Sequence, residues 1–143
     1  MESSPEARVR IAELERAAPI RPHGVWMRDD DRVLLCGTIG AEFDVWQRRL
    51  SLTSAADALF SQRIGLDAVE RVMDGLEEAA RKEVEAEGRS LKPRRSPGYG
   101  DLPLGLSRTI LAKLDAMKRI GVSITDSDLL VPSKSVTAIC EIC

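Results

Sequence analysis

An eight-residue stretch at positions 94–101, Arg-Arg-Ser-Pro-Gly-Tyr-Gly-Asp, combines two cations with rigid turn chemistry and the chain's single tyrosine. Its proline fixes one backbone angle, and its two glycines allow positive φ and a close approach of a ligand to bare main-chain amides. Arg94 or Arg95 could bind a carboxylate through two parallel charge-assisted hydrogen bonds, and Tyr99 adds a ring face and a hydroxyl. These groups suit a zwitterionic ligand with a flat ring. The alternative interpretation is an ordinary Pro-Gly turn between two helices, with solvated arginines.

The spacing Arg94-x-x-x-Gly98-Tyr99 resembles the adenosylmethionine-binding motif of the activation domain of cobalamin-dependent methionine synthase. Four further segments resemble elements of that family in the same order: Cys-Gly-Thr-Ile-Gly at 36–40, Gly-Leu-Asp-Ala-Val-Glu at 65–70, Arg-Ile-Gly-Val-Ser-Ile-Thr at 119–125 and Pro-Ser-Lys-Ser-Val-Thr-Ala at 132–138. The resemblance extends from about position 33 to position 142, which is most of the chain.

The resemblance implies an α+β fold in one activation domain-like unit at 33–143, preceded by a partly helical N-terminal extension at 1–32. It also implies that the cofactor is S-adenosyl-L-methionine. Glu70 lies at the edge of a helical apolar stripe, where a lone glutamate is usually solvated; the resemblance instead implies that it contacts the cofactor. The cofactor-binding residues implied in this way are Glu70, Arg94, Ser96, Gly98 and Tyr99.

By the same resemblance, the chain is expected to be a reactivation module that supports reductive methylation of cob(II)alamin in a methyltransferase system. The cobalamin would be held by a partner, either a corrinoid-binding protein or a methyltransferase subunit, and a flavodoxin-like or other low-potential donor would supply the electron. The alternative is a non-catalytic docking or scaffold protein for a corrinoid protein, one that has lost cofactor binding. The short N-terminal region motivates this alternative, because an acidic residue that binds the methionine end in the larger enzymes has no evident counterpart.

Other groups in the sequence have weaker claims to chemistry. Ser133-Lys134-Ser135 lacks the preceding glycines and following helix of a phosphate-binding loop, and no serine elbow or triad surrounds His23, the single histidine. Three consecutive acids at 29–31 cannot all face one ion in an extended chain, so we expect a solvated turn. The pair Cys140 and Cys143 has the C-x-x-C spacing of a metal or redox site but no second pair, so this remains a third, minor hypothesis.

Apolar periodicity predicts the elements that position these residues. A buried strand is expected at 33–36, ending in a turn at Gly37, and a strand with one buried face at 135–142. Helical spacing is found at 3–18, 43–50, 55–64, 66–88 and 106–121, the last with Asp101 as its predicted cap. Helices and strands in this order predict helices packed against a small antiparallel or mixed sheet.

Composition restricts the class of protein and its partners. The 143 residues are 43% hydrophobic and 31% charged, which is typical of one globular domain with a real core. Interleaved charges that sum to −2 and an aromatic content of 3% argue against nucleic acid as a partner. No apolar run approaches the roughly 20 residues of a membrane span, and the first residues lack the pattern of a secretory signal. We therefore expect a cytoplasmic protein that has no membrane or nucleic-acid partner.

Overall fold

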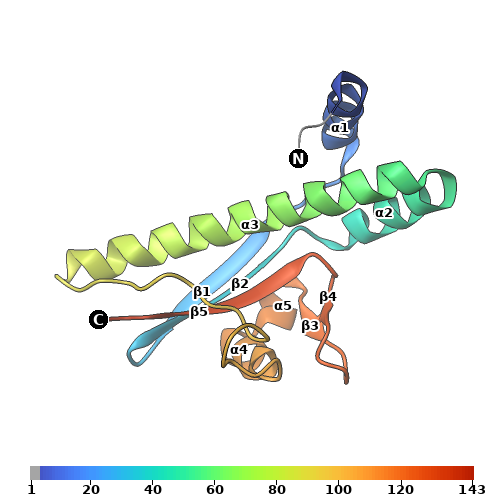
Figure 1. Ribbon diagram of the computed structural model, residues 1–143. Helices are drawn as coiled ribbons and strands as arrows, with labels where there is room; N and C mark the ends of the chain where they lie inside the picture. Colours follow the sequence, from blue (N-terminus) through green and yellow to red (C-terminus); the bar gives the residue numbers. More distant parts are fainter. Residues whose placement is uncertain (1–3) are drawn as a thin grey trace.

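The computed structural model describes residues 4–143 and shows an α+β protein with a small antiparallel sheet between helices (Figure 1). Its elements in chain order are α1 (Pro5–Ala17), β1 (His23–Asp29), β2 (Arg32–Thr38), α2 (Ala41–Thr53), α3 (Ala55–Ala86), α4 (Leu106–Leu114), α5 (Ala116–Ile120), β3 (Ser123–Ile124), β4 (Leu130–Val131) and β5 (Ser135–Glu141). The predicted fold class is confirmed.

The main sheet has the strand order β1-β2-β5, and both pairings are antiparallel. The central strand β2 pairs Leu35 with Trp26 of β1 and with Ala138 of β5. A tight turn at 30–31 joins β1 to β2, with Asp30 in the left-handed conformation at φ 57°. The two short strands β3 and β4 form a separate antiparallel hairpin ahead of β5.

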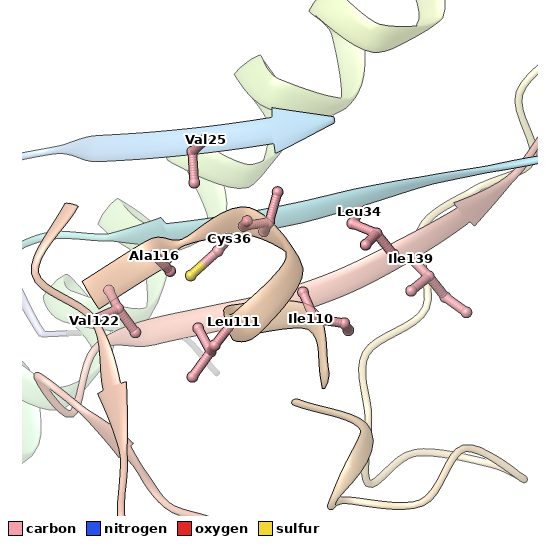
Figure 2. Close-up of a cluster of buried hydrophobic side chains, with 9 residues drawn as sticks. Val25, Leu34, Cys36, Ile110, Leu111, Ala116, Val122 and Ile139 are labelled. Atoms are coloured by element: carbon pink, nitrogen blue, oxygen red, sulfur yellow. The ribbon is translucent and has the colours of Figure 1, made fainter. Parts of the chain in front are cut away.

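Helices cover both faces of the main sheet. The long helix α3 lies along one face, while α4 and α5 lie on the other (Figure 1). Figure 2 shows the second layer, where Leu34, Cys36 and Ile139 of the sheet meet Ile110 and Leu111 of α4. The expectation that β5 buries only one face is therefore wrong, since its two faces pack against different helices. Accordingly, nearly all residues of β2 and most residues of β5 are buried.

The helix α3 joins two segments that sequence periodicity predicts as separate helices. Ser54 caps it, because the Ser54 hydroxyl accepts a hydrogen bond from the Asp57 amide at 3.1 Å. The helix then continues without a break through Gly65, so its 32 residues span about 48 Å. A methyl group built on Gly65 would lie 2.7 Å from the ring of Phe43, so glycine at this position allows α2 to pack closely against α3.

Three predicted boundaries differ from the structure. Gly37 lies within β2, where it admits Val72 and Met73 of α3, and the chain turns instead at Gly40, with φ 90°. The helix expected at 106–121 is split into α4 and α5 by Asp115, which has φ 52°.

Asp101 was also predicted to cap this helix, but the helix begins after Gly105 and has no side-chain cap. Asp101 instead accepts a hydrogen bond from the Arg95 guanidinium at 3.1 Å.

The N-terminal region contains a helix and also a strand of the sheet. The predicted helix at 3–18 corresponds to α1, with Ser4 as its cap; residue 3 lies outside the described residues. Two kinds of contact attach α1 to the rest of the protein. Leu14 is buried, and the Arg10 guanidinium donates two hydrogen bonds, of 2.7 and 3.0 Å, to the Asp57 carboxylate of α3. The strand β1 follows within residues 1–32, where sequence analysis predicted no strand. None of the described helices is both apolar enough and long enough to cross a lipid bilayer.

Candidate functional site

A groove with a volume of about 1010 Å³ lies along the outer edge of β5 and reaches α3 on one face of the sheet and α4 on the other. Its lining comes mainly from α3, α4, β5, the segment at 93–100 and the β3–β4 hairpin. The lining residues are Leu66, Glu70, Glu77, Pro93, Arg94, Arg95, Ser96, Pro97, Tyr99, Gly100, Leu104, Ser107, Asp128, Leu129, Leu130, Ser133, Ser135, Val136 and Thr137. This volume is at the upper end of the range of about 300–1,000 Å³ usual for small-molecule sites.

Backbone pairing fixes the position of Arg94. The segment at 90–95 runs beside the outer edge of β5, where Arg95 and Ile139 exchange two backbone hydrogen bonds of 2.9 Å each. Neighbouring side chains in an extended segment point to opposite sides. Arg94 therefore points toward α3, while Arg95 points away and pairs with Asp101 at 3.1 Å and with Glu141 at 3.6 Å. Of the two arginines that the sequence offers, the structure places Arg94 against Glu70.

Three carboxylates of α3 surround the Arg94 guanidinium. It donates to Glu70 at 2.6 Å, to Asp74 at 2.8 Å and to Glu77 at 2.9 Å. These acids are spaced i, i+4 and i+7, so they lie on one face of the helix. Glu77 also accepts from Arg81 at 2.9 Å. The described part of the groove thus holds an arginine whose guanidinium is already paired, at the edge of an acidic strip.

Burial and ion pairing act in opposite directions on the ionisation of this cluster. Burial by itself would lower the pKa of Arg94, but hydrogen bonds to Asp74, Glu70 and Glu77 outweigh it and raise that pKa. Burial would likewise raise the pKa of Glu77, but hydrogen bonds from Arg81 and Arg94 hold it below its ordinary value. Both groups are therefore charged at neutral pH.

The loop after Arg94 forms one rim of the groove. Gly98 and Gly100 have the predicted positive φ, at 92° and 59°. The expectation of bare amides is wrong at two positions, because the Gly98 amide donates to the Leu102 carbonyl at 2.9 Å and the Tyr99 amide to the Ser96 carbonyl at 3.3 Å. Tyr99 is 75% exposed, so its ring is free to cover a ligand. Ser96 and Tyr99 line the groove, whereas Gly98 shapes the turn behind it.

Hydroxyl groups and apolar side chains line the remainder of the groove. Ser107 of α4 and Thr137 of β5 share a buried hydrogen bond of 2.9 Å between their hydroxyls. Leu66, Leu104 and Leu129 are 46%, 46% and 63% exposed. No motif in the sequence identifies these three leucines as part of a site, because they come from separate segments: α3, the loop before α4 and the turn between β3 and β4. Their only signal is the apolar residue type at positions that the structure leaves exposed.

Of the other groups considered from the sequence, Ser133 and Ser135 line the groove, whereas the cysteines, Asp29 and His23 do not. Burial raises the pKa of Cys36 and of Cys140 to about 12, while Cys143 is exposed. No cluster of three or more potential metal ligands occurs within residues 4–143. Asp29 forms ion pairs with Lys113 at 2.8 Å and with Arg32 at 3.1 Å.

Lys134 lies between two groove residues in sequence but does not line the groove; its side chain is buried near Gly65. Burial lowers its pKa, and the charge of Asp44 opposes this effect.

The arrangement suits a ligand with a charged end and an uncharged, partly flat body. The Glu70–Arg94 pair offers one anion and one cation to a zwitterion. The hydroxyls and leucines offer hydrogen bonds and apolar contact to a ring system. In the described groove, the Ser133 hydroxyl donates to the Asp44 carboxylate, but Asp44 does not itself line the groove and no histidine does. The arrangement therefore favours binding and positioning.

Comparison with solved structures identifies a similar fold. A crystal structure of the MetH reactivation domain bound to AdoHcy matches with a TM-score of 0.71 and 15% sequence identity, over 95% of this chain and 63% of that chain. The chain thus spans less than two thirds of the length of that neighbour. No protein-family model matches the sequence, and no curated protein does. At this identity the likeness establishes the architecture: the chain has the fold of the MetH reactivation domain.

Proposed function

We propose that this protein is an adenosylmethionine-binding reactivation module that supports reductive methylation of cob(II)alamin in a cobalamin-dependent methyltransferase such as methionine synthase. The observation that carries the proposal is the Glu70–Arg94 pair at 2.6 Å in a large groove, on a fold of which one solved example is bound to AdoHcy. AdoHcy, adenosylhomocysteine, is adenosylmethionine without its sulfonium methyl group. The fold and the chemistry of the groove therefore favour the same class of ligand.

The Glu70–Arg94 pair can admit a zwitterion by exchanging partners. The α-carboxylate of the ligand replaces Glu70 on the Arg94 guanidinium, and the ligand ammonium then takes the carboxylate of Glu70. One ion pair is replaced by two, so the number of paired charges does not fall. Asp74 and Glu77 keep Arg94 in place during the exchange. Ser96 and Tyr99, on the rim, are placed to hold the adjoining part of the ligand.

In this proposal the chain binds and orients, and a partner holds the cobalamin. When bound, adenosylmethionine would supply the methyl group for cobalt that a flavodoxin-like or other low-potential donor has reduced, and would leave as adenosylhomocysteine. The work of this chain is to fix the direction of the sulfonium relative to the docked partner. The exposed leucines at the groove, Leu66, Leu104 and Leu129, support docking of a corrinoid-binding protein or methyltransferase subunit.

Calorimetric titration with adenosylmethionine tests the proposal. We expect one ligand per chain, and an Arg94→Ala variant should bind at least about tenfold more weakly, since a hydrogen-bonded charge contributes roughly 1.5–3 kcal/mol. Arg71→Ala is the matched control, because Arg71 is an exposed arginine of α3, next to Glu70, and does not line the groove. A folded parent protein that takes up no adenosylmethionine would refute the proposal.

The second candidate is a docking or scaffold protein for a corrinoid protein that has lost cofactor binding. One observation favours it: the Arg94 guanidinium already has three carboxylate partners. A pull-down that recovers a corrinoid protein, together with calorimetry that shows no adenosylmethionine binding, would select this candidate.

A further inference from the structure

We propose that Asp128 is a specificity-determining residue of the groove that accepts hydrogen bonds from the ribose hydroxyls of a nucleoside ligand. This inference rests on the proposed function, because it assumes that an adenosyl compound occupies the groove. It concerns the side of the groove formed by the β3–β4 hairpin, which the sequence motifs do not include.

Asp128 is the one charged residue that the hairpin contributes to the described groove. The other charged residues of the lining, Glu70, Glu77, Arg94 and Arg95, come from α3 and from the segment beside β5. A ligand whose amino-acid end lies between Glu70 and Arg94 places its nucleoside in the remainder of the groove. Asp128 supplies the one carboxylate of the described lining that does not come from α3.

The Asp128 carboxylate keeps hydrogen-bonding capacity. Arg108 donates to its Oδ1 at 3.0 Å and, with the same nitrogen, to the Thr125 carbonyl at 3.0 Å. The second oxygen, Oδ2, lies near Gly105, 3.9 Å from the position that a methyl group built on that glycine would take. An ionised carboxylate offers about four acceptor positions, and the side chain of Asp128 is 34% exposed. It can therefore accept from a vicinal diol while it keeps Arg108.

The turn that carries Asp128 is held in place before any ligand binds. The Thr125 amide donates to the Leu129 carbonyl at 2.8 Å, and the Asp128 amide donates to the Thr125 carbonyl at 3.0 Å. The Leu129 amide also donates to the Thr125 hydroxyl at 3.1 Å. Asp128 itself has φ 64°, a conformation that aspartate and asparagine tolerate better than most residues. An acceptor already fixed in this way loses little conformational entropy when the ligand binds.

Two ligands and two variants test the inference by calorimetry. The ligands are adenosylmethionine and its 2′,3′-dideoxy analogue; the variants are Asp128→Asn, which keeps an acceptor for Arg108, and Asp126→Asn. Asp126 is an exposed acid of the same turn that does not line the groove, so it is a matched control. Thermal melting of each variant checks that the hairpin remains folded.

We expect Asp128→Asn to bind adenosylmethionine about 10- to 100-fold more weakly than the parent, the loss typical of a charge-assisted hydrogen bond. The parent should bind the dideoxy analogue more weakly than adenosylmethionine by a similar factor. Asp128→Asn should bind the two ligands with nearly equal affinity, because the substitution and the missing hydroxyls remove the same interaction. Asp126→Asn should bind as the parent does.

The inference would be overturned if Asp128→Asn bound adenosylmethionine as tightly as the parent does, or if the substitution weakened the binding of both ligands by the same factor. Either result would leave the proposed function standing. A parent protein that binds neither ligand would overturn both.

Discussion

Removal of the Arg94 guanidinium should destabilise the fold and not only the site. In Arg94→Ala, the carboxylate of Glu77, 14% exposed, keeps Arg81 as its one arginine partner. Loss of a charged hydrogen-bond partner at a partly buried group costs roughly 1.5–3 kcal/mol. The pairs with Glu70 and Asp74 add little, because these carboxylates are 55% and 69% exposed. We therefore expect the free energy of unfolding to fall by about 2–3 kcal/mol, and Tm by roughly 4–12 °C.

The pH dependence of this loss follows from the lowered pKa of Glu77. A carboxylate whose folded pKa lies below its unfolded value stabilises the protein above the unfolded value, and that contribution disappears as pH falls through the folded pKa. Because Arg94 helps to lower this pKa, the difference between parent and Arg94→Ala should be largest at neutral pH. It should shrink as pH falls below the ordinary glutamate value of 4.5.

Urea unfolding at pH 7 and at about pH 3.5 measures both effects, with the slope m checked for two-state behaviour. Arg63→Ala is the control, because Arg63 is 81% exposed and its contact with Asp67 is 3.6 Å long. The double variant Arg94→Ala, Glu77→Gln should lose less than the sum of the single losses, since the two residues are in contact. Equal stability of parent and Arg94→Ala at pH 7, or a difference that does not change with pH, would refute this reasoning.

Two further predictions concern the core. Gly65→Ala should lower the free energy of unfolding by about 1–3 kcal/mol, because its new methyl group would lie 2.7 Å from Phe43. Gly75→Ala in the same helix has nothing within 4 Å and should raise it by about 0.5–1 kcal/mol. Chemical denaturation of both variants checks the opposite signs, and a stabilised Gly65→Ala would contradict the packing described. In a thiol-labelling assay on the native protein, the exposed Cys143 should react while the two buried cysteines do not; rapid labelling of all three would contradict their burial.

Much of the fold could be predicted from patterns within one element. The apolar run at 33–36 predicts β2, and the periodic stripe from Leu66 to Val84 predicts most of α3. The continuity of α3 through Gly65 could not be predicted in this way, because glycine there serves a contact with Phe43 that is 22 positions away in sequence. The strand β1 was missed because its burial depends on pairing with β2, and its own residues show little alternation.

The candidate site likewise has one part that the sequence predicts and another that it does not. The motif at 94–99 identified Arg94, and the structure places it in contact with Glu70, 24 positions earlier. The other two partners of Arg94, Asp74 and Glu77, could not be predicted, because they become its neighbours only when the segment at 90–95 pairs with β5. Asp128 was missed for a similar reason: its turn meets the groove only through the β3–β4 hairpin.

A crystal structure of this protein soaked in adenosylmethionine is the most direct test of the proposed function. We predict that the ligand lies in the groove beside β5, with its carboxylate on Arg94, its ammonium on Glu70 and its ribose facing Asp128. Crystals whose groove stays empty at saturating ligand, with the Glu70–Arg94 pair unbroken, would contradict the proposed binding of adenosylmethionine. The assignment of the fold would not be affected.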